Sequence, residues 1–368
     1  MILKSVKIEG LFQKFNYNIQ FDKQEGLTIL YGLNGIGKTT ILNILASFSK
    51  FGFLNIFKIP FKTITFAFGP FDEEDLFELN VIFTKNDEIR VDFNIKFNDF
   101  FFQQSFLSVE EIEDVCMTLN YKYSALSRDQ PDITFKIDKK NPSDEDLIAL
   151  ITVFIFKFNC LYIESLRNSL YDFDILDEYY TEKKNTQKGI EKVKNDLKEK
   201  YKLADPFDIE VKVLNDLMKF YYNRKLELIS QDLSELADDD EDVQLFLSVI
   251  NKYLDFKKLD VENGAGIIIT LDDEMKSILP FTSLSSGEMN LLIIFYIIIF
   301  VAKEDSLVLI DEPEISLNIN WHYDFIDTLR NIRKEKKIHY LIATHSPQIV
   351  NDYTNNCVDA EYKEKIIK

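Results

Sequence analysis

The chain has 368 residues, enough for one large domain or two ordinary domains with a sizeable core. Hydrophobic residues make up 46% of it and charged residues 29%, which is typical of globular proteins and excludes general disorder. The 43 Lys and Arg against 62 Asp and Glu leave a net charge of −19. A chain this acidic cannot coat nucleic acid by bulk attraction, so any such contact needs a local basic patch.

The first ten residues alternate like a strand and lack the apolar block of a signal peptide. The longest apolar run, 291–302, is too short to span a bilayer and predicts a buried helix. The cysteines (116, 160 and 357) have no CxxC spacing and indicate a reducing compartment, and the scarcity of histidine argues against a His-built metal site. We therefore expect a soluble, cytoplasmic protein that does not contact membranes.

A glycine-rich turn joins a strand expected at 27–31 to a helix expected at 39–50. The turn reads Gly32-Leu-Asn-Gly-Ile-Gly37-Lys38-Thr39, the pattern of a phosphate-binding P-loop. Glycines let backbone N–H groups turn toward phosphate oxygens, and the helix N-terminus adds a positive dipole end. Lys38 would reach the β- and γ-phosphates, and Thr39 would offer its hydroxyl to Mg²⁺. The expected nucleotide contacts are Asn34, Gly35, Ile36, Gly37, Lys38, Thr39 and Thr40.

The middle of the chain alternates between strand and helix patterns. Strands are expected at 61–68, 77–97 (as a hairpin) and 160–164, and helices from Ser108 and over 143–157. From 168 to 262 glycine is nearly absent and apolar residues fall at helical spacing. Since sustained heptads are lacking, we expect a compact helical insertion rather than a coiled coil. Residues 266–271 return to a strand pattern.

The apolar strand 307–310 ends in two adjacent carboxylates, Asp311 and Glu312. Asp311 would hold Mg²⁺ through water, and Glu312 would polarise the attacking water as general base. Acidic pairs at strand ends are common, so this pair gains its meaning from the P-loop that precedes it.

The segment Leu284-Ser285-Ser286-Gly287-Glu288 precedes the buried helix and allows two interpretations. One is an ordinary helix cap, with serine at the N-cap and a carboxylate in the first turn. The other, favoured by the Asp-Glu strand about 20 residues later, is the signature motif of ABC-type ATPases. That motif presents serine and glycine backbone groups to a γ-phosphate held by a second subunit.

His345 follows another expected strand, 338–343, and matches the switch histidine that senses γ-phosphate in ABC-type ATPases. Ser316-Leu317-Asn318 matches the D-loop, which contacts the other subunit in those proteins. We therefore take Lys38, Glu312 and His345 as the catalytic residues.

The order of these motifs resembles that of ABC-type ATPase heads. Two sequence segments resemble the OLD/SMC-like branch of these ATPases: Asp311-Glu-Pro-Glu-Ile-Ser-Leu-Asn318 and Ala343-Thr-His-Ser-Pro-Gln348. That branch includes ATPase subunits of bacterial anti-phage systems such as Septu, PARIS and the retrons. The resemblance covers roughly 1–60 and 280–350. It departs from the branch at His322, where family members often carry glutamine after the D-loop tryptophan.

The resemblance implies an α/β P-loop NTPase head, with a mixed sheet and an antiparallel β subdomain. We expect lobe I over 1–167, the helical insertion over 168–262 and lobe II over 263–368. Two subunits would sandwich two ATP–Mg²⁺, and hydrolysis would separate them. OLD nucleases add a Toprim domain, for which the 23 residues after His345 leave no room.

The implied role is a switch that senses or regulates a separate nuclease or toxin effector in phage defence. The alternative is an SMC-like ATPase of DNA repair or chromosome maintenance that clamps DNA. An ABC transporter subunit fits poorly, because no membrane-coupling segment is evident. A guanine-specific GTPase is also disfavoured, because the sequence contains no Asn-Lys-x-Asp motif.

The sequence does not decide between two interpretations for several features. The aromatic residues 12, 15 and 17 suit core packing or adenine stacking, and Gln103 and Gln104 suit a polar loop or the Q-loop. The basic segment 183–202 suits a solvated helix face or a nucleic-acid or partner patch. The acidic run 238–242 predicts a solvated loop, and Arg167 suits either a phosphate contact or a lobe interface.

Overall fold

The computed structural model describes residues 2–21, 24–49, 53–69, 77–85, 89–97, 100–106, 111, 158, 160–164, 229–234, 240–262, 265–272, 275–358 and 361–362. The chain divides into two compact units. Unit 1 comprises Met1–Ile163, Ala302–Pro313 and Leu329–Lys368, and unit 2 comprises Glu164–Val301 and Glu314–Thr328. The expected helix at 143–157, nearly all of the helix from Ser108, the basic segment 183–202 and Arg167 lie outside the described residues.

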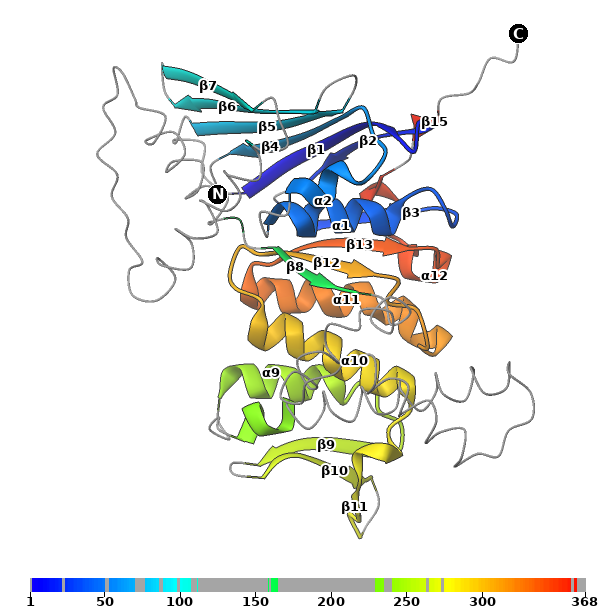
Figure 1. The fold of residues 1–368 in the computed structure, drawn as a ribbon. Coiled ribbons are helices and arrows are strands. Elements are labelled where there is room, and N and C mark those ends of the chain that lie inside the picture. The colour runs from blue at the N-terminus through cyan, green and yellow to red at the C-terminus, as the bar shows by residue number, and fades with distance from the viewer. Residues whose placement is uncertain are drawn as a thin grey trace, which may run out of the picture. The chain divides into compact units, whose positions relative to one another are not determined.

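Unit 1 contains an antiparallel sheet, whose described strands follow the order β15-β2-β1-β4-β5-β6-β7 (Figure 1). These strands are β1 (Ile2–Leu11), β2 (Phe15–Gln20), β4 (Thr63–Gly69), β5 (Phe77–Lys85), β6 (Ile89–Phe97), β7 (Phe100–Phe106) and β15 (Glu361–Tyr362). The hairpin expected over 77–97 is confirmed, since β5 and β6 pair antiparallel from Phe77↔Phe97 to Lys85↔Ile89.

A second sheet of unit 1 is parallel, with its described strands in the order β14-β3-β13-β12-β8. They are β3 (Leu27–Tyr31), β8 (Cys160–Ile163), β12 (Leu307–Asp311), β13 (His339–Thr344) and β14 (Cys357–Val358). β12 and β13 are buried along their whole length, as parallel strands covered on both faces are. The order places the carboxyl ends of β3, β13 and β12 side by side, where ligands of such sheets bind.

Helices α1 (Lys38–Ser49) and α2 (Phe53–Phe57) lie between the two sheets (Figure 1). Phe48 of α1 is fully buried and stacks on Phe66 of β4, with 4.3 Å between ring centroids. The same core includes Leu309 of β12 and Leu341 of β13. Burial on both sides therefore fixes the helix that follows the P-loop. The unit also contains α12 (Pro347–Val350) and η3 (Thr354–Asn356).

Unit 2 combines helices with a small antiparallel sheet. Its elements are α9 (Glu241–Ile250), β9 (Lys257–Glu262), β10 (Gly266–Leu271), β11 (Ile278–Leu279), η1 (Phe281–Ser283), α10 (Ser286–Tyr296) and the π-helix η2 (Ile297–Val301). Helix α11 (Ile319–Lys336) begins in unit 2 and ends in unit 1. No helix within the described ranges is long and apolar enough to cross a membrane.

Two sequence expectations differ from the structure in this unit. Strand β9 lies within the range expected to be helical, because buried Leu259 and Val261 alternate with exposed residues at period two. The acidic run is not a loop throughout: Asp240 caps α9 by accepting hydrogen bonds from the backbone N–H groups of Asp242 (2.9 Å) and Val243 (3.3 Å). Acidic side chains suit that place, since they complement the helix dipole. The boundaries of the insertion stay a prediction.

Candidate nucleotide site

The P-loop turn lies between β3 and α1 and depends on glycine. Gly35 and Gly37 have φ values of 84° and 100°, which side chains other than glycine rarely adopt. A Cβ on Gly37 would lie 2.8 Å from Leu11 Cδ2 and 3.1 Å from a ring carbon of Phe12. The turn is therefore packed against the end of β1, and a side chain at Gly37 would be strained as well as crowded. Asn34 and Gly35 are exposed at its tip, and Thr40 is half-buried in α1.

Lys38 and Thr39 begin α1 directly behind this turn. The Lys38 side chain is buried, and its ammonium donates to the carbonyl oxygens of Gly32 (2.8 Å) and Leu33 (3.1 Å). Thr39 Oγ1 donates to Asp311 Oδ1 at 3.2 Å. The structure thus brings the end of β12 against the P-loop helix, although 272 residues separate the two side chains.

Asp311 is 2% exposed, and desolvation raises its pKa to about 6. The neighbouring charge of Glu312 also raises this pKa, whereas the hydrogen bonds from Thr39 and Tyr162 and the charge of Lys38 lower it. Tyr162, on β8, donates its hydroxyl to Asp311 Oδ2 at 3.4 Å. Tyr162 was not among the site residues predicted from the sequence. The only available signal was its place on the strand expected at 160–164.

Glu312 and His345 lie together beyond the ends of β12 and β13. Glu312 has a φ of 46°, a left-handed conformation that is strained for a non-glycine residue, and its N–H donates to Ala343 O at 2.8 Å. Its Oε1 lies 3.7 Å from His345 Nδ1. Ser346 accepts from the N–H of Ile349 as N-cap of α12, so the residue after the histidine is anchored.

Aromatic residues of the hairpin formed by β1 and β2 contact the P-loop. Tyr17 is 3% exposed and donates its hydroxyl to Ile36 O at 2.6 Å, and burial raises its pKa to about 12. A ring buried in this way packs in the core and cannot stack on a base. Phe15 is partly buried and packs against the same core. Tyr17 instead fixes the carbonyl of a P-loop residue, a role that the sequence analysis did not foresee.

The segment that precedes α10 forms the expected cap. Ser285 Oγ accepts from the N–H of Glu288 at 3.2 Å, and Glu288 Oε2 accepts from the N–H of Ser285 at 2.6 Å, which completes a capping box. Ser285 and Ser286 are exposed, whereas Gly287 and Glu288 are buried. The cap interpretation is confirmed, and a contact with nucleotide stays a prediction.

The expected signature and D-loop segments touch each other within unit 2. A Cβ on Gly287 would lie 2.3 Å from Ser316 O, so only glycine allows this approach. Ser316 has a φ of 66°, and Asn290 of α10 donates to Ile315 O at 3.5 Å. The two motifs therefore hold each other's backbone in place.

The candidate Q-loop residues lie in a regular strand. Gln103 and Gln104 belong to β7, where they pair with Asn94 and Phe93 of β6. The loop interpretation was wrong because the segment continues the hairpin sheet by one more strand. The structure gives no support to a Q-loop at this position.

Comparison with known proteins shows what the chain is similar to. It is 27% identical to Protein ea59 of Escherichia phage lambda over 141 residues, which are 37% of this chain and about a quarter (26%) of that protein's length. A solved SmcHead bound to the C-winged helix domain of ScpA is 13% identical, with 99% and 98% of the two chains covered and a TM-score of 0.43. An Smc head domain with an extended coiled coil, bound to the C-terminal domain of ScpA derived from Pyrococcus furiosus, is 15% identical, with 98% and 96% covered and a TM-score of 0.36.

The family comparison covers nearly the whole chain. The model of the family AAA_15, described as an AAA ATPase domain, matches residues 1–350. This range contains the P-loop, the Asp-Glu strand and the strand before His345, which meet in unit 1 as described above. The protein therefore belongs to the AAA_15 family of AAA ATPase domains.

Proposed function

We propose that the protein binds ATP with Mg²⁺ and hydrolyses the nucleotide at the P-loop of unit 1. The observation that carries this proposal is the 3.2 Å contact between Thr39 Oγ1 and Asp311 Oδ1, beside the buried ammonium of Lys38. Hydroxyl and carboxylate oxygens are the ligands that Mg²⁺ takes next to phosphates. A Cβ on Gly35 would meet no heavy atom within 4 Å, and the backbone N–H groups of such a turn can bind phosphate oxygens.

Five polar side chains of the site have roles in this proposed reaction. Lys38 exchanges its two carbonyl partners for the β- and γ-phosphates. Thr39 and Asp311 are the residues that would hold Mg²⁺, which would supply positive charge beside those phosphates. Glu312 accepts a proton from the attacking water, whose oxygen bonds to the γ-phosphorus while the bond to the bridging oxygen breaks. His345, 3.7 Å from Glu312, contacts the γ-phosphate and orients that carboxylate.

The signature segment Ser285–Glu288 acts, in this proposal, on the nucleotide of a second copy. Its two exposed serines and the N-terminus of α10 offer hydrogen-bond donors and a positive dipole end to a γ-phosphate. Two copies then enclose two ATP–Mg²⁺ between them, and hydrolysis of the ATP lets the two copies separate. The binding energy of ATP becomes a switch between separate and paired subunits.

The variant Glu312→Gln tests this function, because it keeps the side-chain shape and removes the general base. We expect the variant to bind ATP, to lose turnover by about a hundredfold or more, and to double its mass in light scattering when ATP and Mg²⁺ are added. Lys38→Ala is the matched control, which should neither bind ATP nor change mass. An unchanged mass of Glu312→Gln with bound ATP would contradict the paired state.

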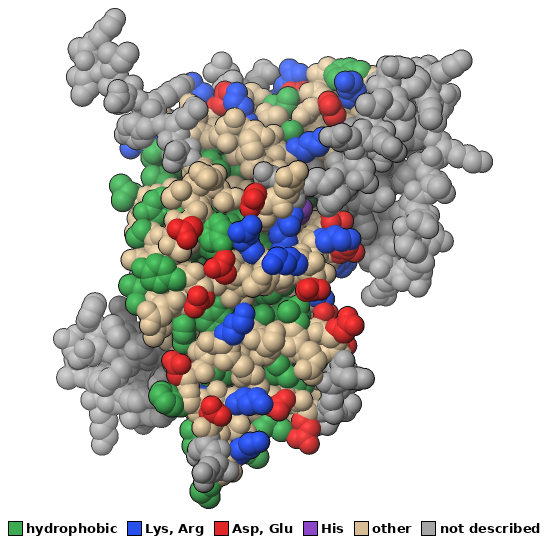
Figure 2. Space-filling view, turned by 180° about the vertical axis from the view of Figure 1, so that it is seen from behind, with side chains coloured by type: hydrophobic (Ala, Val, Ile, Leu, Met, Phe, Trp, Pro, Cys, Tyr) green, Lys and Arg blue, Asp and Glu red, His purple; other side chains and the backbone are tan. Residues whose placement is uncertain are grey.

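We further propose that this switch holds or licenses a separate nuclease or toxin in cytoplasmic anti-phage defence. The support is the resemblance of the motifs around Asp311 and His345 to the OLD/SMC-like branch. On the face drawn in Figure 2, Lys and Arg side chains of the described residues lie near Asp and Glu side chains. Co-purification with a small nuclease would support the role, and ATP-dependent retention on DNA would favour the chromosome-maintenance alternative.

A further inference from the structure

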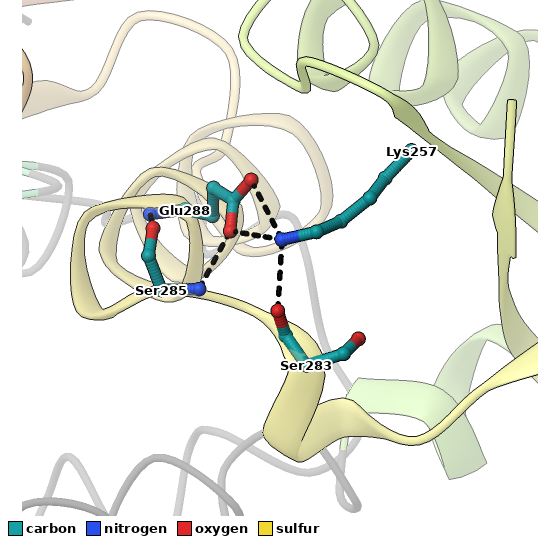
Figure 3. Close-up of polar contacts among 4 residues, drawn as sticks. All are labelled: Lys257, Ser283, Ser285 and Glu288. Carbon is teal, nitrogen blue, oxygen red and sulfur yellow. Dashed lines mark hydrogen bonds and ion pairs between the residues drawn. The ribbon is translucent and has the colours of Figure 1, made fainter.

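Lys257, the first residue of β9, reaches the first turn of α10 (Figure 3). Its Nζ donates to Glu288 Oε2 at 2.8 Å, to Glu288 Oε1 at 3.1 Å and to Ser283 O at 2.8 Å. Both partners flank Ser285, the N-cap of the helix. One ammonium thus joins the sheet of unit 2 to both sides of the expected signature turn.

The charge of Glu288 creates a difficulty for an anion at this turn. The carboxylate side chain is only 8% exposed, and it caps the helix through the N–H of Ser285. An unpaired negative charge in this place would repel a phosphate that approaches the same helix end, and burial weakens the screening by water. Lys257, whose side chain is 20% exposed, pairs with Glu288 and neutralises that charge.

We propose that Lys257 is a positioning residue for the nucleotide of the second copy. It neutralises Glu288, so the capping box can form without placing a net negative charge beside the γ-phosphate. It also holds the carbonyl of Ser283, which fixes the chain that enters the turn. Ser285 and Ser286 then remain exposed in one conformation. This inference rests on the proposed function, because it assigns a role at the same composite site.

The first test compares Lys257→Met with Lys258→Met, the neighbouring lysine that is exposed on the opposite face of β9. We expect Lys257→Met to lower kcat by about tenfold or more, because it leaves a buried carboxylate unpaired. The affinity of a single subunit for a fluorescent ATP analogue should stay within about twofold, since the P-loop is untouched. Lys258→Met should match the wild type in both measurements, and Lys257→Arg should retain most of the turnover.

A double-mutant cycle separates the charge from packing. Glu288→Gln keeps an oxygen that can accept from Ser285 N–H but removes the negative charge. In that background we expect Lys257→Met to change kcat by less than about threefold, because no charge remains to be neutralised. ATP-dependent pairing, measured in the Glu312→Gln background, should be weakened by Lys257→Met alone and much less by Lys257→Met combined with Glu288→Gln.

The inference is overturned if Lys257→Met turns over ATP like the wild type and only its melting temperature falls. It is also overturned if the loss of kcat is as large in the Glu288→Gln background. Other results would contradict the proposed function itself. These are a wild type that does not hydrolyse ATP, or a Lys38→Ala variant that hydrolyses ATP as fast as the wild type, and neither depends on the Lys257 variants.

Discussion

Asp311 is buried at the end of β12, and its carboxyl group has a raised pKa. Desolvation raises its pKa from 3.8 to about 6. Between pH 4 and 6 the folded protein therefore holds a proton that the unfolded chain has lost. Stability falls as the pH rises through this window, and the full penalty of the buried charge is present above it. Burial of the charged Asp311 carboxylate therefore costs folding free energy above this window.

Asp311→Asn should remove this penalty. In the absence of nucleotide and Mg²⁺, we expect the free energy of unfolding at pH 7.5 to rise by about 2 to 3 kcal/mol, because one pKa unit corresponds to about 1.4 kcal/mol. Near pH 4 the variant and the wild type should unfold at the same urea concentration. Glu335→Gln, an exposed carboxylate on α11, is the control that should shift neither value. An equal gain at both pH values would contradict the assignment.

At the scale of elements, the first turn of α10 combines several tasks. Ser285 and Glu288 cap the helix, Gly287 lies against the backbone carbonyl of Ser316, and Lys257 pairs with Glu288 from β9. Alanine normally stabilises a helical position relative to glycine by about 0.5 to 1 kcal/mol. Here the close approach of backbone oxygen reverses that preference.

Gly287→Ala should therefore destabilise the protein. Its methyl group would lie 2.3 Å from Ser316 O, a backbone atom that cannot swing aside. We expect the free energy of unfolding to fall by about 1 to 3 kcal/mol, as in other overpacked sites, and ATP turnover to fall with it. Ser286→Ala, at the exposed neighbouring position, should leave the urea midpoint unchanged. An unaltered midpoint for Gly287→Ala would show that the two segments separate readily in solution.

For the whole molecule, the proposal divides each nucleotide site between two copies. The P-loop belongs to unit 1, and the signature segment belongs to unit 2. In a symmetric pair each P-loop meets the signature segment of the partner, so two different defects can complement each other.

Mixing Lys38→Ala with Ser286→Arg tests this arrangement. Each variant alone should be inactive, because every site of its pair carries the same defect. In the mixture, half of the pairs contain one intact site, so we expect about a quarter of the wild-type turnover. Mixing Lys38→Ala with Glu312→Gln is the control without recovery, since both defects lie in unit 1. Equal activity in the two mixtures would contradict a site shared between copies.

Local sequence patterns predicted much of the fold. Strands β3, β12 and β13, the hairpin of β5 and β6, and helix α1 are confirmed, because alternation, apolar runs and glycine spacing act over a few residues. Strand β9 and the cap at Asp240 were missed, since their residues also suit a charged helix and a solvated loop. Strand β7 was missed because only its pairing with β6 distinguishes it from a polar loop.

The sequence by itself determined the P-loop turn, the capping box and the order of the motifs, because glycine and serine set the backbone within a few residues of themselves. Tertiary structure alone decided which side chains share a site. The contact of Thr39 with Asp311 spans 272 residues, and those of Tyr162 with Asp311 and of Lys257 with Glu288 span 149 and 31. Such contacts follow from sheet order and burial, which no short stretch of sequence contains.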